Sequence, residues 1–274
     1  MSTTLFPDAV TIIVFAFFTG IISAMIGVGG GFLIVPSLVL LFNLPFQQAA
    51  GTSLAMIVFT AVSSTLAYVR QRRIDYGLGL LLTLGSVPGG VVGAALTQFI
   101  AGKALSAAFG VFLSSASLRM VFSKGSPTKE TTPIAKGWRR SLVDAAEHKF
   151  EYAVNPLRGL GLGFLGGLVS GLFGVGGGVV MVPAMRLILG VPMHLAVATS
   201  MFIMIFTSLS GVLTHLTLGN VLPEYVLYLA LGVIIGTQIG AFMAWKTRER
   251  RLQMVFGSFM LLIGVRMLLE YLIY

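Results

Sequence analysis

Gly27–Gly31 reads Gly-Val-Gly-Gly-Gly, and the same five residues recur at Gly174–Gly178. Each copy lies inside a long apolar run and is followed by Val-Pro, at Val35–Pro36 and at Val182–Pro183. Glycine and proline are costly inside a helix, and in lipid every freed backbone group needs a partner. Glycine-rich breaks at matching places in two halves of a membrane protein are typical of a transporter's binding site.

The composition is that of a membrane protein. Of the 274 residues, 56% are hydrophobic and 10% are charged, whereas soluble domains carry about 25% charged residues. The formal net charge is +9, and the basic residues gather in a few loops, which indicates cytoplasmic anchoring rather than nucleic-acid binding. The absence of cysteine excludes disulfides and thiolate metal sites. We expect no removable signal peptide, so the first apolar segment stays in the membrane.

The two glycine motifs belong to a duplicated unit. An offset of 147 residues aligns 20–53 with 167–200 without a gap, and 14 of the 34 positions are identical. Later glycines also match, such as Gly93 with Gly240. Chance similarity between two apolar sequences would not keep glycines and prolines in register, so we interpret the chain as two repeats.

Each repeat contains four apolar segments. The last three suit single spans of about 20 residues; they are 47–69, 77–100 and 104–122, and then 195–218, 223–245 and 252–273. The first segments, 9–42 and 157–190, would form helices of about 51 Å, against a hydrocarbon core of about 30 Å. We therefore predict that each breaks at its glycine loop into two half-helices. Each pair forms either a hairpin that enters and leaves on one face or two short crossings.

The distribution of charge predicts the topology. Basic residues cluster at 70–73, 124–140 and 246–251, and the positive-inside rule places all three clusters in the cytoplasm. This arrangement requires an even number of crossings in each broken segment, and it inverts the second repeat with respect to the first. We predict an all-α polytopic membrane protein of two inverted-topology repeats with both termini outside. A parallel repeat, with 246–251 outside, is the alternative.

The connector between the repeats is the one long polar stretch. We divide the chain into a first transmembrane repeat (1–122), a basic cytoplasmic connector (123–156) and a second transmembrane repeat (157–274). Within the connector, Ser126–Pro133 is a loop by composition. The stretch 138–154 mixes apolar and charged residues, and it is either an interfacial helix or a solvated linker.

The glycine loops do not fit a nucleotide site. Phe32 and Val179 stand where a dinucleotide fingerprint needs glycine, and no Lys-Ser/Thr pair follows. The alternatives are a nest of backbone amides that binds an anion at the start of a half-helix, and close helix packing on small residues. Duplication at mid-segment favours binding.

Hydroxyl residues follow the loops in both repeats. Thr52–Ser53 and Thr199–Ser200 lie early in the next span, where they could donate to an oxyanion or bond between helices. Ser23 and Ser170 precede the glycines and rank lower. The candidate binding residues are therefore Gly27, Gly29, Gly30, Gly31, Thr52, Ser53, Gly174, Gly176, Gly177, Gly178, Thr199 and Ser200.

The remaining polar residues give weaker indications of function. The half-helix Arg186 is interpreted as a residue that snorkels to the interface, and the lone His215 as a packing residue. No carboxylate falls mid-membrane, which argues against an Asp or Glu proton relay. Hydrolase and metalloprotease motifs do not occur, so we expect no enzyme activity, no metal and no cofactor.

The chain resembles the sulfite exporter TauE/SafE family of membrane permeases (TSUP) at four stretches. These are Ile26–Pro36, Gly51–Leu54, Phe173–Pro183 and Ala198–Met201. The resemblance extends over essentially the whole chain and its two halves. It implies transport of small anions such as sulfite and organosulfonates across a bacterial or archaeal cytoplasmic membrane, with protons as the candidate coupling ion. Its motif positions carry over to the loop glycines and the Thr-Ser pairs.

Together these observations predict a secondary transporter of the cytoplasmic membrane. The expected substrate is sulfite or an organosulfonate, bound where the two broken segments meet. A passive anion channel and, further off, a membrane-embedded enzyme or scaffold are the alternatives. The sequence leaves the direction of transport, the coupling ion and the oligomeric state open.

Overall fold

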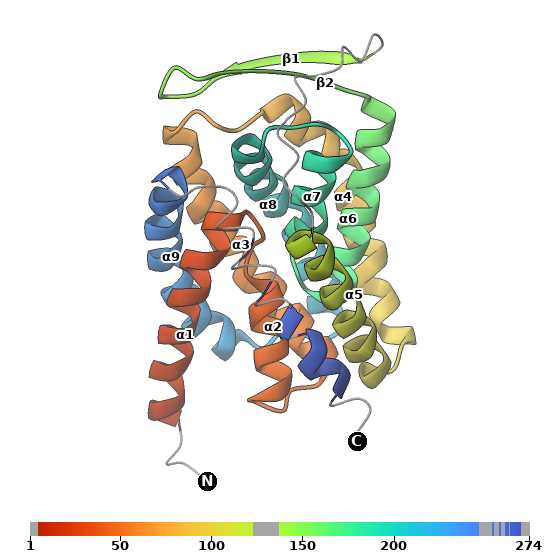
Figure 1. Cartoon of the computed structure of the whole chain (residues 1–274). Coiled ribbons are helices and arrows are strands. Elements are labelled where there is room, and N and C mark those ends of the chain that lie inside the picture. Colours follow the sequence, from red (N-terminus) through yellow and green to blue (C-terminus); the bar gives the residue numbers. More distant parts are fainter. Residues whose placement is uncertain are drawn as a thin grey trace.

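The chain folds into a bundle of helices with a small hairpin at one end (Figure 1). The computed structural model describes residues 5–122, 137–246, 254, 258, 261–262 and 264–269. Its elements are α1 (Leu5–Ile26), α2 (Gly31–Leu40), α3 (Phe46–Arg70), α4 (Tyr76–Leu96), the short 3₁₀ helix η1 (Thr97–Phe99), α5 (Gly102–Phe122), β1 (Trp138–Val143), β2 (Lys149–Val154), α6 (Pro156–Phe173), α7 (Gly178–Leu187), α8 (Met193–Thr217) and α9 (Pro223–Lys246). Most of the predicted last span, 252–273, lies outside the described residues.

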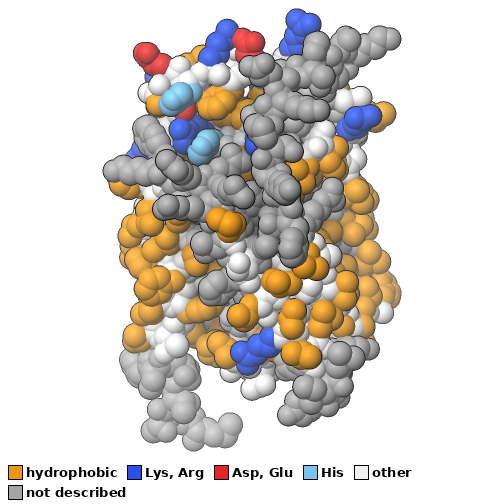
Figure 2. All heavy atoms as spheres, viewed as in Figure 1, with side chains coloured by type: hydrophobic (Ala, Val, Ile, Leu, Met, Phe, Trp, Pro, Cys, Tyr) orange, Lys and Arg blue, Asp and Glu red, His pale blue; other side chains and the backbone are white. Residues whose placement is uncertain are grey.

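Six of the described helices, α1, α3, α4, α6, α8 and α9, are long and apolar enough to cross a membrane. Helices α2 and α7 have 10 residues each and are shorter than a span. The prediction of a mostly helical, multi-pass membrane protein is confirmed. Figure 2 shows hydrophobic side chains along the sides of the bundle, and most of the visible charge at the end that carries the hairpin.

The connector holds a β-hairpin, so of the two alternatives for 138–154 the interfacial helix is wrong, and the solvated linker did not include these strands. Strands β1 and β2 pair antiparallel, with Arg140 opposite Tyr152. The sequence pattern of this stretch has the period of a strand. Apolar residues alternate along β2, where Phe150 is partly buried and Tyr152 and Val154 are buried, whereas Lys149 and Glu151 are exposed. A period of two suits a half-buried strand rather than a helix. These side chains pack on a core cluster that includes residues of α4 and α8.

The chain turns back at each glycine loop. Tyr68, near the end of α3, donates a hydrogen bond of 2.6 Å to the carbonyl of Ala24, near the end of α1. Helix α2 leads from the end of α1 to the start of α3, and it therefore runs antiparallel to α3. In the second half, Nε2 of His215 lies 3.1 Å from the carbonyl oxygen of Gly171, near the end of α6. Helix α7 turns back in the same way.

In each half, the first long helix packs against the third long helix of the other half. Helix α1 of the first half packs along α9 of the second, and α6 of the second half packs along α4 of the first. Glycines make the contacts close. A Cβ atom added to Gly89 of α4 would lie 2.2 Å from the carbonyl oxygen of Phe164, and one added to Gly236 of α9 would lie 2.1 Å from that of Phe17. Both glycines and both phenylalanines are related by the offset of 147. Such contacts let the helix backbones touch.

Candidate functional site

The glycine loops need glycine for conformational reasons. In the first loop, Gly27, Gly29 and Gly30 have φ angles of 82°, 83° and 87°. In the second, the three glycines 147 residues on have φ angles of 73°, 73° and 81°. The left-handed region is open to glycine but strained for most other residues. The loops end α1 and α6 and start α2 and α7.

The two loops contact each other backbone to backbone. A Cβ atom added to Gly31 would lie 2.4 Å from the carbonyl oxygen of Gly174, and one added to Gly178 would lie 2.6 Å from that of Gly27. The start of each loop thus lies beside the end of the other. Glycine is required here for space as well as for φ, because any side chain would separate the loops.

The loops present unpaired amide groups at the start of a helix. Among the described residues, the N–H groups of Gly29–Gly31 and Gly176–Gly178 make no hydrogen bond to a backbone or side-chain acceptor. The first N–H groups of a helix have no partner within that helix, and they carry the positive end of its dipole. Two sets of such donors therefore favour a negative charge at the loops.

One serine hydroxyl beside each loop also lacks a partner. Ser23 and Ser170 are fully buried, and their Oγ atoms have no hydrogen-bond partner in the described part of the chain. The Oγ atom of Ser23 lies 3.5 Å from a Cβ atom built on Gly30, and the Cβ atom of Ser170 lies 3.4 Å from one built on Gly177. Buried hydroxyls without partners are uncommon in folded proteins and need an explanation. The sequence ranked these two serines low.

The serines of the Thr-Ser pairs bond across the halves. Ser53 on α3 donates to the carbonyl of Gly174 at 2.8 Å, and Ser200 on α8 donates to that of Gly27 at 2.7 Å. Ser200 also approaches the carbonyl of Val197 at 2.8 Å. Each half thus holds the loop of the other, and the hydroxyl hydrogens are committed to protein acceptors.

The threonines of the same pairs bond to the opposite half as well. Oγ1 of Thr52 accepts from the N–H of Leu222, just before α9, and Oγ1 of Thr199 accepts from that of Asp75, just before α4. Both bonds measure 3.1 Å. Each pair therefore contacts both the glycine loop and the start of a long helix in the half to which the pair does not belong.

Asp75 joins this network to the hairpin. Its carboxylate caps α4 by accepting from the N–H of Leu78 at 3.0 Å, and it also accepts from Nε of Arg140 at 2.9 Å and from the hydroxyl of Tyr152. Burial raises the pKa of Asp75, but the bonds from Arg140, Leu78 and Tyr152 outweigh it and hold the pKa below its ordinary value. Leu222 occupies the matching position of the second half, so this carboxylate has no counterpart there.

A second buried ion pair holds the hairpin turn. Nη2 and Nε of Arg73 donate to Oδ2 of Asp144 at 2.9 and 3.1 Å. The N–H of Ala145 donates to the carbonyl of Gln71 at 3.1 Å. Burial raises the pKa of Asp144, but the bonds from Arg73 and from backbone N–H groups outweigh it, so the net shift is downward. The hairpin is therefore fastened to the loop between α3 and α4 at both of its ends.

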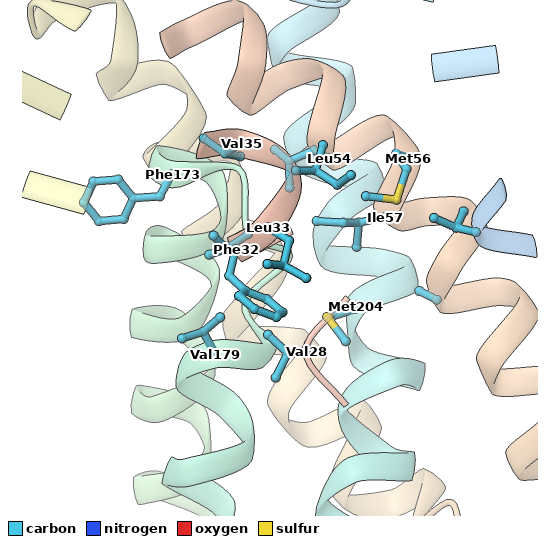
Figure 3. Packing of buried hydrophobic residues seen from close by; sticks show 14 of the residues in the cluster. Val28, Phe32, Leu33, Val35, Leu54, Met56, Ile57, Phe173, Val179 and Met204 are labelled. Carbon is cyan, nitrogen blue, oxygen red and sulfur yellow. The ribbon is translucent and has the colours of Figure 1, made fainter. Parts of the chain in front are cut away.

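Ile57 and Met204 fill the space around both loops. They are fully buried, lie near the midpoints of α3 and α8, and are related by the offset of 147. A Cβ atom added to Gly29 would lie 2.9 Å from Sδ of Met204, and one added to Gly176 would lie 2.8 Å from Cγ2 of Ile57. Figure 3 shows both side chains among the packed hydrophobic residues of the interior, with Met204 near Val28 of the first loop. The loops are covered by apolar atoms in this structure.

Comparison with known proteins decides the family. The family profile described as sulfite exporter TauE/SafE matches residues 12–267. The chain belongs to this family. It is 36% identical over 269 residues to YunE, a probable membrane transporter protein of Bacillus subtilis, covering 95% of the chain and 97% of YunE. It is 27% identical over 273 residues to a probable membrane transporter protein of Methanocaldococcus jannaschii, covering 94% of both chains. No solved structure matches.

The resemblance to the TauE/SafE family drawn from the motifs is confirmed, as is the multi-pass membrane location. The sequence of this TauE/SafE member indicated the loops and the Thr-Ser pairs as candidate site residues, but it did not indicate the buried pair Ile57 and Met204. Aliphatic side chains carry no chemical motif. The only signal was that the two positions are equivalent in the repeat, and many other equivalent positions also hold two apolar residues. Asp75 was given no role from the sequence, because its partners Arg140 and Tyr152 come from the hairpin.

Proposed function

We propose that this TauE/SafE protein is a secondary transporter that binds a small anion, sulfite or an organosulfonate, at the two glycine loops. The observation that carries the proposal is the pairing of unbonded amide groups with an unbonded serine hydroxyl at each loop. Ser23 and Ser170 would donate to the anion's oxygens beside the amides of Gly29–Gly31 and Gly176–Gly178. These hydrogen-bond donors would replace the water molecules around an oxyanion, so that the site needs no buried cation.

The Thr-Ser pairs belong to the site as positioning groups in this proposal. Ser53 and Ser200 are already bonded to loop carbonyls, and Thr52 and Thr199 accept from backbone N–H groups. Their contribution is to aim the amides of the opposite loop. A loop carbonyl that is bonded elsewhere also repels an anion less, since its partial negative charge is shared with the hydroxyl.

The two halves would work as inverted repeats. Support comes from the reciprocal packing of α1 on α9 and α6 on α4, and from the opposite directions in which α1 and α6 run in Figure 1. Helices α2 and α7 turn back, which favours re-entrant hairpins over two short crossings. Rocking of one half against the other around a fixed site would then expose the loops to each side in turn.

The hairpin end would face the cytoplasm. Arg70, Arg72 and Arg139 are exposed there, and basic residues favour the cytoplasmic side. The connector 123–156 is then cytoplasmic, between the membrane repeats 1–122 and 157–274, and both termini are outside. Protons are the proposed coupling ion, and neither enzyme chemistry nor a nucleic-acid partner is part of the proposal.

Flux of labelled sulfite and of a labelled sulfonate into proteoliposomes, with and without a pH gradient, tests the function. We expect saturable flux that responds to the gradient. A flux that does not saturate and carries current would indicate a channel, and no flux of any sulfur oxyanion would remove the substrate class.

A matched pair of variants tests the site. Ser23→Ala with Ser170→Ala removes both unbonded hydroxyls, and we expect the KM for the anion to rise about tenfold or more. Ser115→Ala is the control, because this exposed serine on α5 bonds only within its own helix, to the carbonyl of Phe112. An unchanged KM in the double variant would contradict the assignment of these hydroxyls.

A further inference from the structure

Ile57 and Met204 pack against both glycine loops. A Cβ atom added to Gly31 would lie 2.8 Å from Cδ1 of Ile57, and one added to Gly178 would lie 3.0 Å from Sδ of Met204. With the contacts at Gly29 and Gly176, this pair lies against the middle and the end of both loops. Both side chains are fully buried, so solvent does not reach the loops past them in this structure. An apolar constriction of this kind closes a path by excluding water.

Helices α3 and α8 run in opposite directions past this pair. A Cβ atom added to Gly51, early in α3, would lie 2.4 Å from the carbonyl oxygen of Asn220, just after α8. Ser200, early in α8, bonds to Gly27, which follows the end of α1 where Tyr68 of α3 also bonds. Moving forward along α3 from Ile57 and forward along α8 from Met204 therefore leads to opposite ends of the molecule.

One unbonded hydroxyl lies on each of these two paths. Ser64 follows Ile57 by seven residues, and Ser208 follows Met204 by four, spacings that keep a residue on the same helix face. Both serines are fully buried, and neither Oγ atom has a hydrogen-bond partner within the described residues. A serine in a membrane helix usually bonds to a carbonyl of its own helix, as Ser37 does to Leu33 at 2.7 Å. Ser64 and Ser208 do not.

Small residues extend both paths. Ala61 lies between Ile57 and Ser64 on α3, and Gly211 lies beyond Ser208 on α8. Ala61 and Ser208 are equivalent in the repeat, as are Ser64 and Gly211. Each half thus contributes one hydroxyl and one small residue next to the apolar pair. A Cβ atom added to Gly211 would lie 2.9 Å from Cδ1 of Leu54, so this path is packed in the present structure. The hydroxyls supply contacts that an oxyanion can use.

We propose that Ile57 and Met204 form the gate over the glycine loops, and that the anion passes along the facing sides of α3 and α8, contacting Ser64 on one side of the gate and Ser208 on the other. This inference rests on the proposed function, because it assigns the route to the same loops. Ser64 belongs to the hairpin side and Ser208 to the opposite side.

The absence of native cysteine makes the route testable by labelling. Ser64→Cys and Ser208→Cys are exposed to an anionic, membrane-impermeant methanethiosulfonate from either side of oriented vesicles. We expect the two cysteines to be labelled from opposite sides. Each should react about tenfold faster than Ser117→Cys, because each becomes accessible in a minor state of the protein that opens the path on its side. Ser117 is the control because it is equally buried on α5 and bonds to the carbonyl of Ser114. Labelling from one side only, or no faster than the control, would overturn the route.

The gate is tested in the same labelled backgrounds. Ile57→Ala with Met204→Ala should let each cysteine be labelled from both sides, whereas Leu113→Ala, a truncation of an equally buried residue on α5, should keep the sidedness. Met204→Ala alone serves if the double variant fails to insert, with a smaller loss of sidedness. Retained sidedness in both gate variants, or its loss in Leu113→Ala, would overturn the gate. Labelling needs no substrate, so a correct pattern without sulfite flux would refute the proposed substrate and leave the route standing.

Discussion

The hydroxyl of Ser53 donates to the carbonyl of Gly174 at 2.8 Å, and Ser200 repeats this bond to Gly27 at 2.7 Å. The donor and the acceptor of each bond lie in different halves. Each glycine loop is therefore held by the half to which it does not belong, and neither loop can shift without disturbing the other half. This coupling is what a transporter needs if its two halves are to move around one site.

Removing these bonds should weaken both the fold and transport. Ser53→Ala or Ser200→Ala leaves a buried carbonyl without a partner, which costs about 1–3 kcal/mol. We expect a lower midpoint of thermal unfolding in detergent and a higher KM for the anion. Ser37→Ala is the control, since Ser37 bonds to Leu33 within its own helix. Equal effects of Ser37→Ala and Ser53→Ala would mean that the cross-half bond has no special weight.

The glycine contacts between halves should tolerate no side chain. Gly89→Ala places a Cβ atom 2.2 Å from the backbone oxygen of Phe164, so α4 and α6 must separate. We expect a loss of stability, measured by thermal unfolding. Gly161→Ala on α6 is the matched control, because nothing lies within 4 Å of its added Cβ atom. Alanine at an open helical position adds about 0.5–1 kcal/mol of stability over glycine. Similar behaviour of the two variants would contradict the packing.

The helix ends before the loops are capped by Tyr68 in one half and His215 in the other. These equivalent residues bond the carbonyls of Ala24 and Gly171, which are also equivalent. We expect His215→Tyr to retain stability, because tyrosine makes this bond in the first half, and His215→Phe to lose about 1 kcal/mol. Thermal unfolding of the two variants, with Tyr68→Phe as the parallel case, measures the difference. A tyrosine variant as unstable as the phenylalanine variant would show that the bond is not shared.

The sequence predicted what short-range patterns encode. Glycine loops, membrane-length apolar runs and the offset of 147 were visible in the residues themselves. The hairpin was missed because Trp138–Val143 and Lys149–Val154 are short and half charged, and their partners in α4 and the preceding loop come from the first half of the chain. The roles of Ser53 and Ser200 were left open because a hydroxyl's partner across the bundle is set by helix packing, which no local pattern records.

The hairpin should stabilise the protein in a way that depends on pH. Asp75, with a side chain 1% exposed, accepts from Arg140 and Tyr152 and has a lowered pKa. A carboxyl whose folded pKa lies below its unfolded value of about 3.9 stabilises the fold above that value and loses its contribution as the pH falls through the folded pKa. We therefore expect the contribution to be constant from neutral pH to about pH 5 and to decline on stronger acidification.

The substitution Asp75→Asn isolates this contribution. It removes the charge that pairs with Arg140, so the midpoint of thermal unfolding should fall at neutral pH by the equivalent of about 1–3 kcal/mol, and the difference from the parent protein should shrink below about pH 4. Glu151→Gln is the control, because this carboxylate pairs with Lys149 where both side chains are 64% exposed, and exposed pairs contribute little. If Asp75→Asn and Glu151→Gln behaved alike, the hairpin would be an appendage to the α3–α4 loop. A loss of stability specific to Asp75→Asn would show that the bonds of Asp75 to the hairpin must break whenever the hairpin end opens. The N–H of Asp75 also donates to Thr199, which precedes Ser200, and Ser200 bonds to the first glycine loop.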